Sequence, residues 1–395
     1  MSKRVLFTVV ISSGALALTA CSGLTASTSN DFVGGDPSSV SDALVLKSNI
    51  DNSQELKAGQ SVKFTAQEPW LIESVTVNGP SGTETYGVEA PGEKWKSEPL
   101  APAQMSTFTA TMRNPTTGEA MVVKRQVIAG PATNTFDATI SPDKGSYGVG
   151  IIPEVEFDKD VKNKDRAAMV ERLSVTSSPT QVAGSWRWTD SDTVAFRPDT
   201  KFWPANQKVT VTADLEGAQI TEGKNKISFG EGKVTKTFKI DRAMVLTLNS
   251  DSNSGIATVN GKQVKSFPIS LGKSGYTTRS GIKTITDIIR VQRMTNVGVT
   301  DDEVYDLQVP YAMRITDTGE FLHGAPWNGN IGYANTSHGC SNLTYSDAAW
   351  FFSRVKYGDP VITKNTGRPM EDWNGPGAAW NIKYSKWANT PAAQA

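Results

Sequence analysis

The chain of 395 residues lacks an excess of charge of either sign, because 40 Lys and Arg residues balance 40 Asp and Glu residues. Without a field of one sign, the composition gives no argument for a nucleic-acid partner or for binding to an anionic membrane surface. Long helical patterns are few, whereas 34 glycines, 20 prolines and many Ser, Thr and Asn clusters mark turns. We therefore expect a mainly β protein, whose length suits about two to four domains.

Cysteine and histidine are scarce, with two residues of each, namely Cys21, Cys340, His323 and His338. Three of these four fall between positions 323 and 340, which a uniform scatter would seldom produce. We therefore take this stretch as the candidate site.

The N-terminus has the features of an export signal. Lys3 and Arg4 precede an apolar run, residues 5–20, that is too short and too often interrupted by Ser and Gly for a comfortable membrane span. The run closes on LTAC at Cys21, which resembles a bacterial lipoprotein signal and implies a lipid anchor in the cell membrane, with the protein facing the envelope exterior. The alternative is a secretory signal with an incidental cysteine. If Cys21 is lipidated, Cys340 has no disulfide partner, which indicates a free reactive thiol.

Short alternating runs separated by turn residues fill most of the chain before Arg242. Phe108, Ala110 and Met112, for example, share one face of a period-two run, as in a half-buried strand. Such runs favour small antiparallel sandwiches of immunoglobulin type, without the disulfide of that fold. One helix-like insert, 165–173, interrupts the second unit. The predicted divisions are a signal at 1–21, a flexible tether at 22–44, immunoglobulin-like domains at 45–130 and 131–241, a third β-rich domain at 242–366 and a tail at 367–395.

The third domain contains clear local signals. Asn260 and Gly261 form a strong signal for a type I′ hairpin. One main helix should begin at Thr344, whose spacing to Asp347 resembles a capping box, and Gly358 should stop it. We expect the tail to pack onto this third domain, rather than to bind sugar, through its tryptophans Trp373, Trp380 and Trp387.

The segment around Cys340 suits acyl transfer. A thiol reacts as its thiolate and needs an imidazole, here His323 or His338, to accept its proton. Gly339 allows a tight turn, and the helix start that follows would favour a thiolate. Other interpretations stay open. The cysteine could be a buried structural residue, the histidines could only hold the fold together, or His323, His338 and Cys340 could bind zinc with an open fourth position.

Over about residues 244–366 the chain resembles the catalytic domain of the L,D-transpeptidase family. The family pattern is a histidine, a spacer, and then Ser or Thr followed by His-Gly-Cys-x-Asn. Here His338 follows His323 by 15 positions, and residues 337–342 read SHGCSN. The order of lipoprotein signal, two immunoglobulin-like domains, catalytic domain and Trp-containing tail is similar to the mycobacterial and corynebacterial branch.

The resemblance implies a role for each matching residue. Cys340 would be the nucleophile and His323 the acid/base, with the backbone carbonyl of Gly324, where the branch often has serine, orienting the imidazole. His338 and Gly339 would shape the oxyanion side. The substrate contacts implied by the family are Tyr305, Thr318, Gly319 and Asn342.

The implied reaction is cross-linking of peptidoglycan, without a metal or other cofactor. Cys340 would attack the carbonyl of the third residue of a tetrapeptide stem, a meso-diaminopimelate, and expel D-Ala. The acyl group would then pass to the side-chain amine of an acceptor stem as a 3→3 link, and the site would accept carbapenems. Two other classes remain open, a cysteine carboxypeptidase or endopeptidase with water as acceptor, and a non-catalytic wall-binding lipoprotein.

Overall fold

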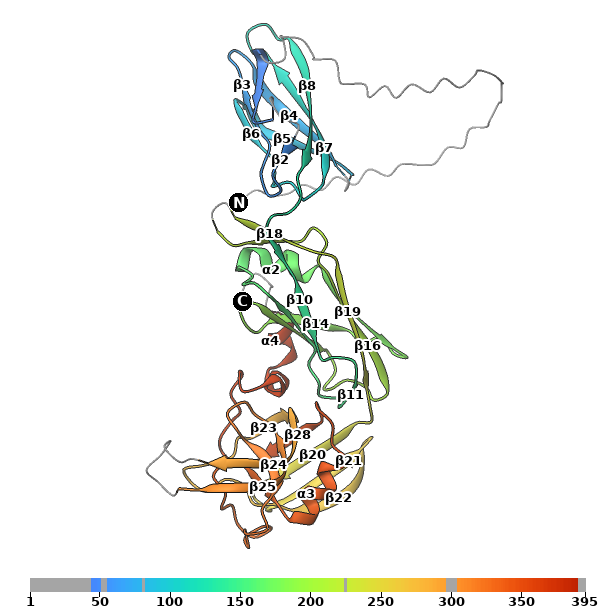
Figure 1. The fold of residues 1–395 in the computed structure, drawn as a ribbon, viewed down its shortest axis with the longest axis vertical. Helices are drawn as coiled ribbons and strands as arrows, with labels where there is room; N and C mark the ends of the chain where they lie inside the picture. The colour runs from blue at the N-terminus through green and yellow to red at the C-terminus, as the bar shows by residue number, and fades with distance from the viewer. Residues whose placement is uncertain (1–43, 51–54, 80–81, 224–225, 296–303, 390–395) are drawn as a thin grey trace, which may run out of the picture.

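The chain folds into three β-rich domains that follow one another along the long axis of an elongated molecule (Figure 1). The computed structural model describes residues 44–50, 55–79, 82–223, 226–295 and 304–389. Two sandwich domains come first, and the domain that carries the candidate site lies at the other end. The prediction of a mainly β protein with two immunoglobulin-like domains is confirmed.

The first domain is a sandwich of two sheets. Its strands are β1 (Leu46–Ser48), β2 (Glu55–Leu56), β3 (Lys63–Ala66), β4 (Leu71–Gly79), β5 (Gly82–Gly92), β6 (Lys94–Lys96), β7 (Met105–Arg113) and β8 (Ala120–Ala129). Their orders are β2-β8-β7-β4-β5 and β1-β3-β6. Phe108, Ala110 and Met112 of β7 are fully buried, which confirms the predicted alternation. The rings of Phe64 and Phe108 meet edge to face at 6.1 Å between the two sheets.

The second domain has two four-stranded sheets and a small third one. Its elements are β9 (Thr135–Phe136), β10 (Ala138–Ser141), β11 (Ser146–Tyr147), β12 (Glu154–Phe157), α2 (Asn163–Val170), β13 (Leu173–Ser178), β14 (Gly184–Trp188), β15 (Thr193–Pro198), β16 (Gln207–Asp214), β17 (Gln219–Thr221), β18 (Ile227–Gly230) and β19 (Lys233–Ile240). The sheet orders are β10-β12-β15-β14, β11-β19-β16-β13 and β17-β18-β9. The helical insert lies two to three residues earlier than the predicted 165–173.

The third domain joins a five-stranded and a four-stranded sheet. Its elements are β20 (Met244–Asn249), β21 (Ser254–Val259), β22 (Lys262–Pro268), β23 (Gly281–Thr284), β24 (Asp287–Thr295), β25 (Asp306–Arg314), β26 (Phe321–Gly324), β27 (Ser341–Leu343), α3 (Tyr345–Phe352) and β28 (Pro360–Lys364). The orders are β22-β21-β20-β28-β23 and β24-β25-β26-β27. Asn260 and Gly261 have φ values of 50° and 79° between β21 and β22. Positive φ at both positions is what a type I′ turn requires, so the predicted hairpin is confirmed.

Helix α3 begins where the sequence predicts and ends earlier. The Thr344 side chain accepts a hydrogen bond from the Asp347 backbone N–H at 3.1 Å, which caps the first turn. The helix ends at Phe352, so Gly358 is not its stop signal. Val355 lies beyond the helix but is still buried in the core of the domain, because the turn that follows α3 folds back onto that core.

The tail bridges the second and third domains through η1 (Pro376–Asn381) and α4 (Tyr384–Ala388). Trp380 donates its indole N–H to the Gly150 carbonyl at 2.8 Å, and Trp387 donates to the Ser185 carbonyl at 2.9 Å. Asn381 holds the third domain by donating to the Ile282 carbonyl at 2.8 Å. The prediction of packing on the third domain alone was therefore incomplete, because both buried tryptophans find partners on the second domain.

Backbone contacts also fix the second domain against the third. The N–H of Gly148 donates to the Tyr357 carbonyl at 2.7 Å, and that of Gly150 donates to the Gly358 carbonyl at 2.8 Å. A Cβ atom at Gly148 would come within 2.3 Å of the Asp359 backbone nitrogen. Only glycine therefore fits at this position without moving the two domains apart.

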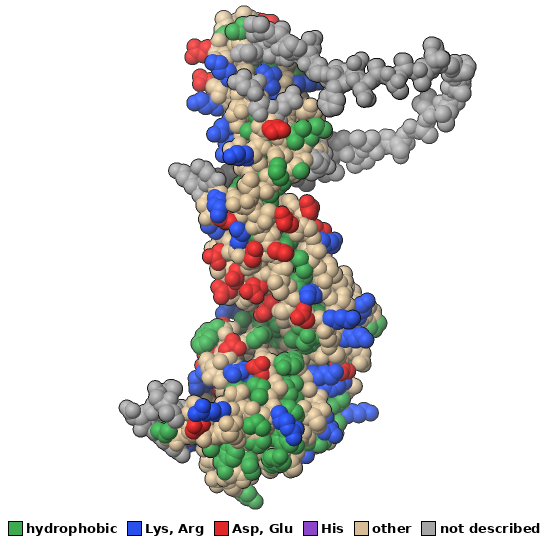
Figure 2. Space-filling view, viewed as in Figure 1, with side chains coloured by type: hydrophobic (Ala, Val, Ile, Leu, Met, Phe, Trp, Pro, Cys, Tyr) green, Lys and Arg blue, Asp and Glu red, His purple; other side chains and the backbone are tan. Residues whose placement is uncertain are grey.

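Charge is balanced over the whole chain but not over each face. On the face in Figure 2, acidic side chains gather over the middle of the molecule, whereas both signs occur on the third domain. Among the described residues, no helix is long and apolar enough to cross a membrane. Cys21 and the tether up to residue 43 lie outside the described residues, so the lipoprotein signal stays a prediction.

Candidate active site

The strands β26 and β27 bring the two halves of the sequence pattern together. They pair in parallel, with Leu322 opposite Ser341 and His323 opposite Asn342. Side chains alternate along a strand, so His323 and Asn342 share one face, and Cys340 extends that face by one step. His323 and Cys340 are therefore diagonal neighbours across the ladder rather than direct partners.

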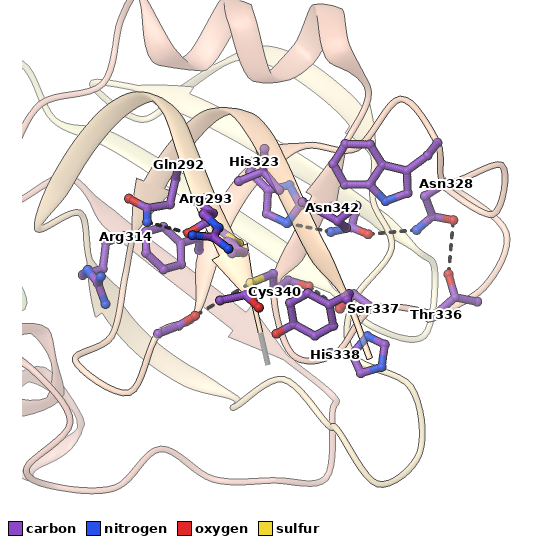
Figure 3. Close-up of a pocket in the computed structure, with 18 of the residues that line it drawn as sticks. Gln292, Arg293, Arg314, His323, Asn328, Thr336, Ser337, His338, Cys340 and Asn342 are labelled. Atoms are coloured by element: carbon purple, nitrogen blue, oxygen red, sulfur yellow. Dashed lines mark hydrogen bonds between the residues drawn. The ribbon is translucent and has the colours of Figure 1, made fainter. Parts of the chain in front are cut away.

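The imidazole of His323 is buried and held at both nitrogens. Its Nδ1 lies 3.0 Å from the Gly324 carbonyl, which can only accept a hydrogen bond. Nδ1 therefore carries the proton, and Nε2 is free to accept. The Asn342 side-chain amide donates to Nε2 at 3.0 Å, and the Asn328 side-chain amide in turn donates to the side-chain oxygen of Asn342 at 2.9 Å (Figure 3). Burial lowers the pKa of His323, which favours the neutral ring.

The Cys340 thiol rests in its neutral form. Its Sγ lies 3.8 Å from the Gly319 carbonyl, toward which the S–H points. The protein packed around the sulfur raises the pKa of the thiol to about 11, and the helix start that follows does not reverse this. Within the described part of the chain, no hydrogen bond joins the thiol to the imidazole. The resting site is therefore a neutral thiol beside a neutral imidazole.

A serine-anchored turn presents the cysteine. The Ser337 hydroxyl donates to the Cys340 carbonyl at 2.6 Å and accepts from the Gly339 backbone N–H at 3.1 Å. Gly339 has φ 118°, in the region that favours glycine, as expected for the tight turn before Cys340. His338 packs between two tyrosine rings, with centroids 4.7 Å from Tyr276 and 5.2 Å from Tyr305.

A cavity of about 670 Å³ opens over the cysteine. It brings together all but one of the residues predicted for the active site, since Gly339 is not among the residues that line it. The predicted residues that line the cavity are Tyr305, Thr318, Gly319, His323, His338, Cys340 and Asn342. The roles assigned to them individually stay predictions.

Two families match separate parts of the chain. Residues 245–363 match the L,D-transpeptidase catalytic domain, and residues 53–219 match a bacterial Ig domain. L,D-transpeptidase 2 of Mycobacterium tuberculosis (strain CDC 1551 / Oshkosh) is 32% identical over 362 residues, which cover 88% of this chain and 85% of that protein. The chain belongs to the L,D-transpeptidase family. It is therefore an enzyme, an acyltransferase of the kind that uses a cysteine nucleophile.

Other members of this family show the same likeness over shorter stretches. L,D-transpeptidase 1 of Mycobacterium tuberculosis (strain ATCC 25618 / H37Rv) is 30% identical over 229 residues, which cover 57% of this chain and 83% of that protein. A solved structure of an L,D-transpeptidase in complex with imipenem is 29% identical, covers 58% of this chain and 99% of that chain, and has a TM-score of 0.49. Cys340 is the single cysteine within the residues that match the catalytic domain.

The sequence analysis assigned no role to two residues of this transpeptidase site. Trp327 lines the cavity and lies parallel to the His323 ring, with centroids 6.2 Å apart. Thr278 is buried and donates to the Gly339 carbonyl at 2.7 Å. Both lie inside or beside stretches that match the family, but a Trp or Thr alone carries no chemical signal. Their roles follow only from what they contact.

A zinc site needs several ligands that converge on one ion. Among the described residues, no three His, Cys, Asp or Glu side chains converge as a group that could hold a metal ion. The three side chains that the zinc interpretation needs, those of His323, His338 and Cys340, thus form no such group.

Proposed function

We propose that this transpeptidase joins peptidoglycan stem peptides through 3→3 links, with Cys340 as nucleophile and His323 as acid and base. The observation that carries the proposal is the fixed tautomer of His323. Because Nδ1 keeps its proton and donates it in a hydrogen bond to the Gly324 carbonyl, Nε2, on the side of the ladder that carries Cys340, can accept a proton.

The reaction follows in two acyl transfers. Rotation of the Cys340 side chain away from the Gly319 carbonyl brings the thiol to Nε2 of His323, which displaces the Asn342 amide. Nε2 takes the thiol proton as sulfur attacks the carbonyl of the meso-diaminopimelate at position three of a donor stem. The C–N bond to D-Ala breaks, and the imidazolium returns the proton to the leaving amine.

The second transfer regenerates the thiol. The side-chain amine of an acceptor diaminopimelate attacks the thioester and loses its proton to His323. The carbon–sulfur bond then breaks, and the thiolate recovers a proton from the imidazolium. Water in place of the amine would give the carboxypeptidase or endopeptidase reaction, because both share the thioester.

The substrate would occupy the cavity over Cys340. Tyr305, Thr318, Gly319 and Asn342, the substrate contacts implied by the family, all line it. For the oxyanion, we assign the turn at His338 and Gly339. The Gly339 N–H is already bound to Ser337, so this residue contributes the shape of the turn rather than a donor.

The test is mass analysis of the products formed from purified tetrapeptide stems. Wild-type protein should give dimers that have lost one D-Ala, whereas Cys340→Ala should give none and should keep its thermal midpoint. His323→Ala should lose at least about 100-fold in rate, the usual contribution of a general base. Tripeptides without dimers would favour hydrolysis, and stem binding without any product would favour the wall-binding interpretation. Wild-type rates in Cys340→Ala would rule the mechanism out.

We further propose that Cys21 carries the lipid and that the two sandwich domains hold the site away from the membrane. The support is the LTAC sequence at the end of the apolar run and the elongated arrangement of the domains (Figure 1). Cys21→Ser should move the protein from the membrane fraction to the soluble or unprocessed fraction. Unchanged membrane fractionation of Cys21→Ser would contradict the anchor and would leave the proposed reaction untouched.

A further inference from the structure

A buried ion pair lies inside the third domain and has no part in the reaction described above. Lys283 of β23 has 0% of its side chain exposed, and its Nζ lies 2.7 Å from Oε2 of Glu320, whose side chain is 5% exposed. Lys283 also donates to the Thr363 hydroxyl at 3.4 Å. Removing both charges from water is costly, and hydrophobic replacements often stabilise a protein as well or better. Its presence therefore calls for an explanation other than stability.

The pair lies close to residues that contact the cysteine or adjoin it. Glu320 follows Gly319 in the chain, and the Gly319 carbonyl accepts the hydrogen bond of the Cys340 thiol. On the other flank, Thr278 donates to the carbonyl of Gly339, the residue before the cysteine, at 2.7 Å. The short segment from Thr278 to Lys283 thus contacts Gly339, the residue before Cys340, and Glu320, the residue after Gly319.

A second cation completes the cluster. Arg279 donates from its backbone N–H and from its guanidinium to Oε1 of Glu320, each at 3.0 Å. The same guanidinium pairs with Glu371 of the tail. The Glu320 carboxylate is therefore held by two cations, one at each oxygen, next to Gly319 in the chain.

The charges of this cluster act on the thiol in opposite directions. Lys283 lowers the pKa of Cys340 and Glu320 raises it, although burial is the larger influence. Burial lowers the pKa of Lys283, and the neighbouring carboxylate opposes this. The other ionisable groups that line the cavity with the thiol are Arg293, Tyr305, Arg314, His323 and His338, and Arg279 is bound to Glu320.

We propose that Lys283 and Glu320 are positioning residues that set the acidity of the Cys340 thiol through their buried charges. The inference rests on the proposed function, in which Cys340 is the nucleophile. Neither side chain touches the substrate cavity, so the effect is exerted through the Gly319 carbonyl and through space. With the pair intact, the two charges act on the sulfur in opposite directions, while burial keeps the resting thiol neutral.

The experiment is the pH dependence of Cys340 alkylation by iodoacetamide, followed by mass spectrometry of the peptide that carries Cys340. Lys283→Met removes a positive charge and should move the midpoint of the profile to higher pH. Glu320→Gln removes a negative charge and should move it to lower pH, each by on the order of one unit. The charge-balanced double variant should return close to the wild-type midpoint.

A merely structural role predicts a different pattern. It would lower the thermal midpoint of both single variants. It would also move both alkylation profiles in the same direction or leave both unchanged, and either result would overturn the proposal. Arg279→Met removes a cation at the edge of the cluster and should act like Lys283→Met, so the test stands even if Lys283→Met fails to fold. Lys262→Met, on an exposed hairpin, is the matched control and should leave the profile unchanged.

The readout is the thiol itself and requires no substrate. An absence of transpeptidation products with the opposite shifts present would count against the proposed function and in favour of this inference. Normal transpeptidation with no shift of the alkylation midpoints would support the proposed function and overturn this inference.

Discussion

Asn342 donates a hydrogen bond to Nε2 of His323 over 3.0 Å and so occupies the nitrogen that the mechanism needs as its base. The cause is the register of β26 and β27, which places His323 opposite Asn342 and leaves Cys340 one step along the same face. The asparagine thus fixes the orientation of the ring from its Nε2 side. We infer that it acts as a placeholder for the thiol between turnovers.

Removal of this amide should therefore change the pH dependence as well as the rate. A donor to the unprotonated nitrogen stabilises the neutral ring, so Asn342→Ala should raise the pKa of His323 and move the acid limb of kcat/KM to higher pH. The freed ring should also cost about 10- to 100-fold in kcat/KM at the optimum, part of the usual contribution of a general base.

Asn328→Ala is the matched control for this change. Asn328 donates to Asn342 rather than to the imidazole, so its removal should have a smaller effect of the same sign. An Asn342→Ala profile that loses rate at all pH values without moving its acid limb would indicate a substrate contact alone, as the family resemblance implies. The pH-rate profiles of the three proteins decide between these roles.

Local features of the fold could be predicted from the sequence because they depend on neighbours along the chain. The hairpin at Asn260 and Gly261 follows from residues that tolerate positive φ, and the burial of Phe108 follows from strict alternation. The site was found because two rare residue types cluster within a short stretch and match a known pattern. These are signals that a single sequence can carry.

The remaining features depend on contacts between distant residues. Lys283 and Glu320 are separated by 37 positions, and each alone looks like an ordinary surface residue. The end of α3 depends on how the next turn packs, and the docking of Trp380 depends on Gly150, which is 230 positions away. The diagonal placement of His323 and Cys340 needs the strand register, which no local pattern encodes.

Asn374 of the tail should support the wall of the cavity. It is fully buried. Its side-chain oxygen accepts from the Thr318 backbone N–H at 3.1 Å, and its side-chain amide donates to the Thr318 hydroxyl at 2.9 Å. Asn374→Ala leaves the Thr318 N–H without this partner, which typically costs about 1–3 kcal/mol. We expect a lower thermal midpoint and a several-fold rise in KM for the stem peptide. Asn389→Ala, at the exposed end of α4, should change neither, and equal effects of both variants would contradict the assignment.

Glu154 should make stability depend on pH. Burial, with Asp317 and Glu156 nearby, raises its pKa from 4.5 to about 7. The folded protein therefore holds a proton that the unfolded chain releases between these values, so the free energy of unfolding should fall as pH rises from about 4.5 to 7 and then level off. Glu154→Gln should remove this loss and stabilise the protein at pH 8 by on the order of 1–3 kcal/mol.

Urea unfolding at several pH values measures this directly. Near pH 4.5 the variant and the wild type should have similar stability, because Glu154 is then protonated in the folded protein. Glu231→Gln, an exposed change of the same charge, is the control and should be neutral throughout. A Glu154→Gln protein that is no more stable than wild type at pH 8 would show that the carboxyl is not strained by its neighbours.

A covalent carbapenem adduct at Cys340 should separate an acyl-transfer enzyme from a wall-binding protein. A strained β-lactam carbonyl is a good target for a thiol with a neighbouring base, and ring opening makes the acylation effectively irreversible. The cavity of about 670 Å³ over the cysteine leaves room for such a molecule. Intact-protein mass spectrometry should show a gain of one drug per chain in the wild type, none in Cys340→Ala and a slower gain in His323→Ala.

The adduct should also block alkylation of Cys340, whereas a zinc-bound thiol would resist alkylation before the drug and react after chelation. A chain that stays unmodified after long exposure, with Cys340 still open to alkylation, would show that the thiol is not activated and would favour the wall-binding interpretation.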